Sequence, residues 1–132
     1  MKSSGLSRFT PYLLSVLRLV AAFVYIAHGT QKMFGVPGHP LHAPVLAVTM
    51  MGAAGVLETI GGALMFLGLF TRPVALVLSG QMAVAYFTQH FPRGPWPILN
   101  GGELAVLFCF LWLFLCVAGP GPISLDALRG KR

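Results

Sequence analysis

Four long apolar blocks, separated by short breaks rich in proline and glycine, organise the chain. Each block is close to the length of about 20 residues that a helix needs to cross the roughly 30 Å hydrocarbon core of a bilayer. The pattern predicts an all-α integral membrane protein, a four-helix transmembrane bundle, as a single domain over residues 1–132. We predict spans at about 12–33, 45–70, 73–91 and 101–117.

Composition supports the membrane class. Hydrophobic residues make up 56% of the chain and charged residues only 9%, whereas a soluble domain carries about 25% charged residues. The formal net charge of +6 would suggest nucleic acid in a soluble protein. Here the basic residues lie mostly at the chain ends and between spans, where they act as topology signals and contact anionic lipid. We therefore expect the lipid bilayer, and not nucleic acid, as the partner.

The basic residues also predict the orientation. Four spans place both termini on the same side of the membrane, and the side with more Lys and Arg is normally cytoplasmic. We therefore expect cytoplasmic termini, with Lys32 and Arg93 on the outer side. The residues expected on the inner side are Lys2, Arg8, Arg72, Arg129, Lys131 and Arg132.

Arg18 lies inside the first predicted span, where an unpaired charge costs at least a few kcal/mol. The chain has only three acids, Glu58, Glu103 and Asp126. Glu58 falls near the middle of the second predicted span and is nearest to Arg18 in depth. We predict a buried Arg18–Glu58 charge pair, which either fixes the register of the helices or handles protons at a quinone head group. Gln81, in the third span, could hydrogen-bond Glu58.

A second polar group is expected near the outer face. His28 and Lys32 are four residues apart, so they share one side of a helix. Asn100 and Glu103 begin the fourth predicted span on the same side of the membrane. We predict that these four residues form a ligand-binding site, in which Glu103 is the acid partner of Lys32 and His28. The alternative for Glu103 is a plain capping role, because a carboxylate in the first turn is favoured by the helix dipole.

Small residues mark a packing face on the second predicted span. Gly55, Thr59 and Ala63 repeat every fourth position, and Gly62 lies beside them. Such residues let a neighbouring helix approach closely in a membrane. The neighbour is either another span of this chain or a different membrane protein.

The histidines raise the question of haem or metal. His28 and His90 lie near the outer ends of their spans and could face one another as axial ligands do. The chain has no Cys-x-x-Cys-His sequence, and the sequence argues against haem. His39 and His42 are only a weak metal signal, so no metal site is predicted.

The order and spacing of several short motifs resemble the DoxX family of small bacterial inner-membrane proteins. The resemblance covers about residues 17–128. It implies a four-helix membrane bundle in the bacterial inner membrane, and a relationship to DoxD, the membrane subunit of a thiosulfate:quinone oxidoreductase. It also implies relatives in membrane-associated oxidoreductase complexes. The matching residues are Arg18, His28-Gly29-x-x-Lys32-Met33-Phe34-Gly35, Glu58-x-x-Gly61-Gly62, Met82, Asn100-Gly101-Gly102-Glu103 and Ser124-Leu125-Asp126.

Three functions follow as hypotheses. The first is a subunit of a quinone-linked redox complex, with the quinone head group near His28, Lys32 and Glu103 and a redox protein or a second copy as partner. The second is a small proton-coupled carrier that uses Glu58. The third is a structural or assembly subunit that docks through its small-residue face. The sequence leaves open whether the chain catalyses a reaction by itself.

Overall fold

The computed structural model describes residues 5–38 and 49–130, and this part of the chain is helical with no strand. Two minor helices, α4 and α6, lie before and after α5. The π-helix η2 continues α3. The 3₁₀ turn η1 precedes α1, and the 3₁₀ turn η3 follows η2. The elements are η1 (Ser7–Phe9), α1 (Thr10–Phe34), α2 (Met50–Leu67), α3 (Thr71–Ala85), η2 (Tyr86–His90), η3 (Phe91–Arg93), α4 (Pro97–Asn100), α5 (Glu103–Ala118) and α6 (Leu125–Arg129).

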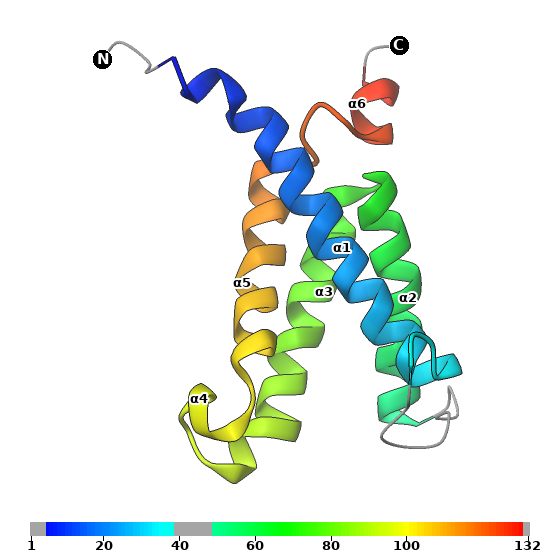
Figure 1. Cartoon of the computed structure of the whole chain (residues 1–132), viewed down its shortest axis with the longest axis vertical. Coiled ribbons are helices and arrows are strands. Elements are labelled where there is room, and N and C mark those ends of the chain that lie inside the picture. Colours follow the sequence, from blue (N-terminus) through cyan, green and yellow to red (C-terminus); the bar gives the residue numbers. More distant parts are fainter. Residues whose placement is uncertain (1–4, 39–48, 131–132) are drawn as a thin grey trace.

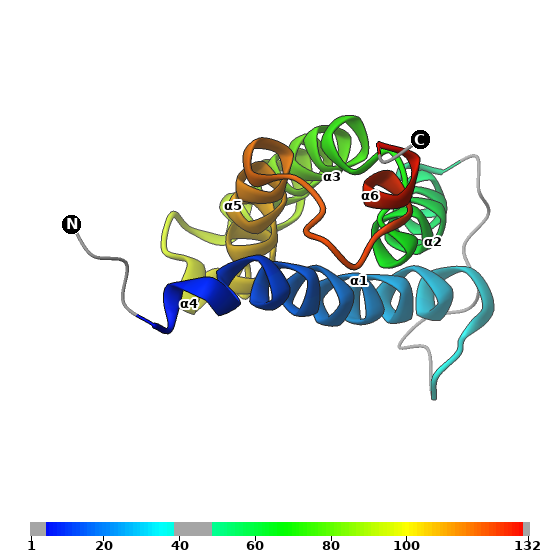
Figure 2. The same ribbon diagram turned by 90° about the horizontal axis from the view of Figure 1, so that it is seen from above.

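The helices pack mainly in two pairs (Figure 1). α1 lies along α2, and α3 lies along α5, while α2 and α3 join the pairs. Seen from above in Figure 2, α2, α3 and α5 form an arc and α1 runs across its open side. This arrangement leaves room for side chains from all four helices to meet at one end of the molecule.

The helix boundaries follow local chemistry. α1 begins beside Pro11, which suits a first turn, and ends at Gly35 in the left-handed conformation with φ 70°. α2 ends at Leu67, three residues before the predicted limit, because Gly68 adopts φ 66° and caps the helix. The predicted start of that span, near residue 45, lies outside the described residues.

The third predicted span is regular only in part. α3 begins at Thr71, two residues before the predicted start, and its α-helical part ends at Ala85. The remaining residues to His90 form the π-helix η2, in which the hydrogen-bond spacing widens by one residue. π-helical segments are rare and are frequent at functional sites.

Among the described residues, two helices are long and apolar enough to cross a membrane, Ser7–Phe34 with 28 residues and Met50–Leu67 with 18. The 16-residue α5 is apolar but shorter. Large apolar side chains point outward from all the long helices, among them Phe23, Leu76 and Leu107. A soluble monomer rarely exposes so much contiguous apolar surface, whereas lipid accommodates it.

An aromatic cluster joins α1 to α5 in the core. The ring of Tyr25 lies 5.2 Å from the rings of both Phe108 and Trp112. Trp112 is fully buried, and aromatic pairs at such distances attract beyond the area they bury. The cluster holds the middle of α1 against the rest of the molecule.

Arg18 is fully buried and binds backbone carbonyls. Its guanidinium donates to Met65 O and, at 2.7 Å, to Phe66 O in the last turn of α2. It also donates to Ile123 O and, at 2.9 Å, to Pro120 O in the segment after α5. The last carbonyls of a helix lack intrahelical partners and carry partial negative charge, so Arg18 satisfies them and ties the C-terminal segment to α2.

The predicted Arg18–Glu58 pair is therefore wrong. Arg18 lies level with the C-terminal end of α2, while Glu58 lies in the N-terminal half of that helix and pairs with Lys32. The prediction considered only acidic side chains at a similar depth as partners for Arg18 and left out backbone carbonyls. Five N–H donors on a guanidinium can equally be satisfied by carbonyl oxygens.

Asp126 fixes the same end of the molecule. Its carboxylate accepts hydrogen bonds from the backbone N–H groups of Phe70, at 2.9 Å, and Thr71, at 2.8 Å, at the start of α3. Burial raises the pKa of Asp126. The hydrogen bonds from Thr71 and Phe70 and the charge of Arg129 lower it by more than burial raises it, so the net pKa lies below the usual value. The carboxylate is thus ionised at neutral pH and caps α3.

Replacing Arg18 with Lys tests this account of the buried cation. An ammonium group keeps the charge but cannot reach acceptors on both α2 and the 120–123 segment. Each buried carbonyl left unsatisfied costs about 1–3 kcal/mol, so we expect Arg18→Lys to lower the thermal unfolding temperature of the purified protein in detergent clearly. The exposed substitution Arg8→Lys is the matched control and should change nothing. Equal unfolding temperatures for both variants would contradict the account.

Candidate functional site

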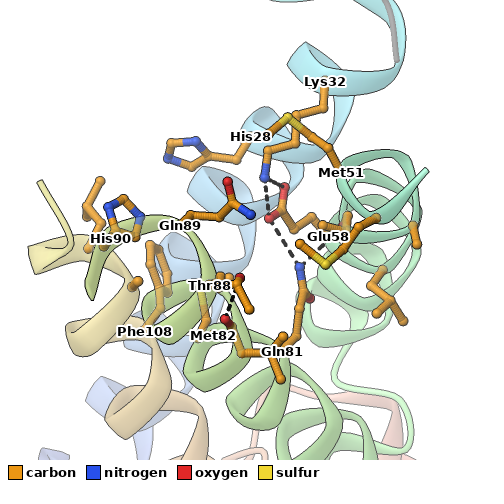
Figure 3. A pocket seen from close by; sticks show the side chains of 18 of the residues that line it. His28, Lys32, Met51, Glu58, Gln81, Met82, Thr88, Gln89, His90 and Phe108 are labelled. Atoms are coloured by element: carbon orange, nitrogen blue, oxygen red, sulfur yellow. Dashed lines mark hydrogen bonds and ion pairs between the residues drawn. The ribbon is translucent and has the colours of Figure 1, made fainter. Parts of the chain in front are cut away.

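A cavity of about 560 Å³ lies between α1, α2, α3 with η2, and α5, at the end opposite Arg18 (Figure 3). One part of its wall is apolar and the other carries hydrogen-bonding and charged groups. The polar lining residues are Tyr25, His28, Lys32, Glu58, Gln81, Thr88, Gln89, His90 and Arg93, and the apolar ones include Met50, Met51, Leu57, Met82 and Phe108.

An ion pair between α1 and α2 forms the centre of the polar wall. Lys32 Nζ lies 2.6 Å from Glu58 Oε1 and 2.8 Å from Oε2. The side chain of Glu58 is 3% exposed and that of Lys32 is 30% exposed. The carboxylate is thus buried, and the ammonium group connects it to the cavity.

The pair forms because α1 and α2 cross at very short distance beside it. A Cβ atom on Gly29 would lie 2.5 Å from Thr59 Oγ1 and 2.6 Å from Thr59 N. Only a glycine permits such an approach of two backbones. Lys32 follows Gly29 by three residues and Glu58 precedes Thr59, so the crossing brings the two charged groups together.

The small residues of α2 face α1. A Cβ on Gly62 would lie 2.7 Å from Ile26 Cγ1, and one on Gly55 would lie 3.0 Å from Met33 Sδ. Thr59 contacts Gly29, whereas Ala63 is exposed and lies off this face. Because α1 covers Gly55, Thr59 and Gly62, this face is not available to dock a different membrane protein.

Gln81 extends the ion pair to α3. Its amide Nε2 donates to Glu58 Oε1 at 3.2 Å and to Ala54 O at 3.3 Å, so the predicted Gln81–Glu58 hydrogen bond is confirmed. Tyr25 Oη in turn donates to Gln81 Oε1 at 3.0 Å. Glu58 therefore accepts hydrogen bonds from both Lys32 and Gln81, so its carboxyl group joins α2 to α1 and α3.

The π-helix η2 brings further polar groups to the cavity. His90 Nδ1 lies 3.1 Å from Asn100 O. In the tautomer that carries its proton on Nδ1, the ring donates to this carbonyl and Nε2 is left as an acceptor. His28 of α1 lies on the same side of the cavity as His90 (Figure 3). The site thus combines donors and acceptors contributed by different helices.

Two of the four residues predicted for the outer site line the cavity, His28 and Lys32, and two do not. Asn100 is buried and braces the loop before α5, because its amide donates to Gly94 O at 2.7 Å and its carbonyl accepts from Gly102 N at 2.8 Å. Glu103 is exposed in the first turn of α5 and makes no hydrogen bond or ion pair within the described residues.

The expectation that Glu103 is the acid partner of Lys32 is wrong, and the cause is a helix boundary. The predicted second span begins near residue 45, which places Glu58 at mid-membrane. α2 begins at Met50, so Glu58 lies only about two turns from the N-terminal end of the helix. Lys32, near the end of α1, can then reach it.

Gln89, Arg93 and Met51 also line the cavity, and none of them was predicted from the sequence to do so. A signal for Gln89 was present, because Gln81 and Gln89 are eight residues apart and share one helix face. No comparable pattern marked Met51, whose position depends on how α2 begins. In the ranges 5–38 and 49–130, no three His, Cys, Asp or Glu side chains gather where they could hold a metal ion. His39 and His42 lie outside those ranges.

The apolar helices and this cavity define a small all-helical inner-membrane protein with a buried polar site. The chain belongs to the DoxX family, whose model matches residues 13–91. It is 41% identical to an uncharacterized protein of Haemophilus influenzae, over 93% of this chain and 95% of the relative. It is 31% identical to the inner membrane protein YphA of Escherichia coli, over 88% and 89%.

A more distant relative is the Bacillus subtilis protein named "Putative oxidoreductase CatD", which is 25% identical over 89% of this chain and 88% of its own. No solved structure matches the chain.

Substituting Gly29 by Ala tests whether the α1–α2 crossing builds the site. The added methyl group would overlap Thr59 and separate the helices, at a cost of about 1–3 kcal/mol for overpacking. We expect a lower thermal unfolding temperature in detergent and a weakened Lys32–Glu58 pair. Gly80→Ala is the matched control, since nothing lies within 4 Å of a Cβ at Gly80. If the two variants unfold alike, the close crossing does not support the site.

Proposed function

We propose that the cavity binds the head group of a membrane quinone and that the protein is a subunit of a membrane-associated redox complex. One observation carries the proposal: a buried network of ionisable and hydrogen-bonding groups, centred on Lys32 and Glu58, lies against the apolar wall of a roomy cavity. A quinone ring needs such an apolar slot with polar groups at its edge. The name of the Bacillus subtilis relative agrees with redox chemistry.

The polar groups suit both oxidation states of a quinone. The oxidised ring presents carbonyl oxygens, which accept hydrogen bonds from Lys32 or from a ring N–H of His28. The reduced ring presents hydroxyl groups, and His90 Nε2 is an acceptor for one of them. Conversion of quinone to quinol takes up two electrons and two protons. In this proposal the electrons come from a partner oxidoreductase, and the imidazole and ammonium groups supply the protons.

The proposal includes a membrane arrangement. α1, α2, α3 with η2, and α5 serve as a bundle of four spans, with both termini in the cytoplasm. Arg18 and Asp126 then lie toward the inner side and the cavity toward the outer side, where Lys32 and Arg93 are the basic residues. The excess of Lys and Arg near the termini and at Arg72 supports this orientation.

The two other hypotheses have less support. A proton-coupled carrier that uses Glu58 needs a carboxyl group that gains and loses its proton readily. The side chain of Glu58 is only 3% exposed, and both of its oxygens already accept hydrogen bonds from Lys32 or Gln81. An assembly role through the small-residue face conflicts with the cover that α1 provides.

Binding of a short-tailed ubiquinone to the protein in lipid nanodiscs tests the proposal. The double variant Lys32→Gln/Glu58→Gln removes both charges together and leaves no unpaired ion. Because a charge-assisted hydrogen bond is worth about 1.5–3 kcal/mol, we expect its dissociation constant to rise by about tenfold or more, with the unfolding temperature measured in parallel.

Arg8→Gln is the control, because Arg8 is exposed and far from the cavity, and it should bind like the wild type. No binding by the wild type, or equal binding by the double variant, would rule the proposal out.

A further inference from the structure

A second, apolar cavity of about 290 Å³ lies between α2 and α3. All its lining residues are apolar, and they include Ile60 and Leu64 of α2 and Val74 and Val77 of α3. Ile60 and Val77 are exposed, so the cavity is a groove open to the surrounding lipid. A molecule in the membrane can enter it from the side.

The groove adjoins the polar cavity at one shared lining residue. Leu57 lines both of them, and Glu58, the buried acid of the polar network, is the next residue in the chain. From Leu57 the groove follows α2 to Leu64, away from the end where Arg93 lies. Seven residues of helix correspond to about 10 Å. The polar cavity and the apolar groove thus meet at Leu57, and the groove runs on to Leu64 and Pro73, near the opposite end of α2 and α3.

We propose that the α2–α3 groove binds the first part of the isoprenoid tail of the quinone whose head group occupies the polar cavity. This inference rests on the proposed function. A ligand that fills both cavities must have a polar head that ends near Leu57 and an apolar tail that begins there. A phospholipid chain is the competing occupant and would enter from the other end of the groove, at Leu64 and Pro73. The quinone tail is favoured because the groove begins at Leu57, which also lines the polar cavity.

The groove then selects the ligand by its tail as well as by its ring. Tail packing against Ile60, Val77 and Leu64 adds dispersion contacts that loosely packed lipid does not offer. A ring without a tail lacks these contacts and binds through the polar cavity alone. Blocking the groove should therefore affect tailed ligands and leave tail-less ones unchanged.

Val77→Trp is the variant that fills the groove, and Leu76→Trp is its matched control. Both positions are on the outer surface of α3, with exposures of 55% and 56%, but only Val77 lines the groove. The probes are a tail-less ubiquinone ring analogue and the same ring with a decyl tail, titrated into nanodiscs of fixed lipid content. For Val77→Trp we expect the decyl ligand to bind about tenfold more weakly and the tail-less ligand to bind as in the wild type. Leu76→Trp should bind both ligands normally.

The outcomes separate the two levels of the proposal. If the wild type binds neither ligand, the proposed function itself fails. If the wild type binds both and Val77→Trp changes neither, the head-group site stands and the tail assignment is overturned. Equal weakening of both ligands would also overturn it, since the Trp would then act by distorting the polar cavity. Loss of co-purified phospholipid from Val77→Trp, with decyl-ubiquinone binding intact, would assign the groove to a lipid chain instead.

Discussion

The contact between α1 and α2 at Gly29 is the constraint on which the polar site depends. In lipid, apolar surface gains little from burial against another helix, so close packing and polar bonds must hold the helices together. Gly29 and Thr59 bring the two backbones together, and Lys32 and Glu58 pair immediately beside them. Packing and electrostatics therefore reinforce each other at one place, and the cavity opens next to it.

The two buried charged groups are stabilised separately, at opposite ends of α2. Arg18 satisfies carbonyl groups at the C-terminal end of the helix and in the segment after α5. Glu58 is satisfied by Lys32 and Gln81 in the N-terminal half. The first arrangement leaves no group directed at a ligand and serves stability. The second lies in the wall of the cavity, and its ammonium group is partly exposed, so it is available to a ligand.

The helical class, the helix breaks and the Gln81–Glu58 contact were predictable from the sequence, because they depend on apolar length, on proline and glycine, and on residue depth. The partner of Arg18 was not, because the acceptors are backbone carbonyls that no residue type reveals. The pairing of Lys32 with Glu58 was missed because it depends on where α2 begins. His28 and Lys32 were found by their spacing of four, whereas Asn100 and Glu103 face away because the loop before α5 turns at Gly101 and Gly102.

The quinone content of the protein purified from its native membrane tests the central claim most directly, namely that the Lys32–Glu58 pair forms the head-group site of a membrane quinone. Lipid extracts of the wild type and of the Lys32→Gln/Glu58→Gln variant are compared with the bulk membrane. The account predicts more quinone per lipid in the wild type than in the membrane, and none of this enrichment in the variant. A wild-type ratio equal to that of the bulk membrane would contradict it.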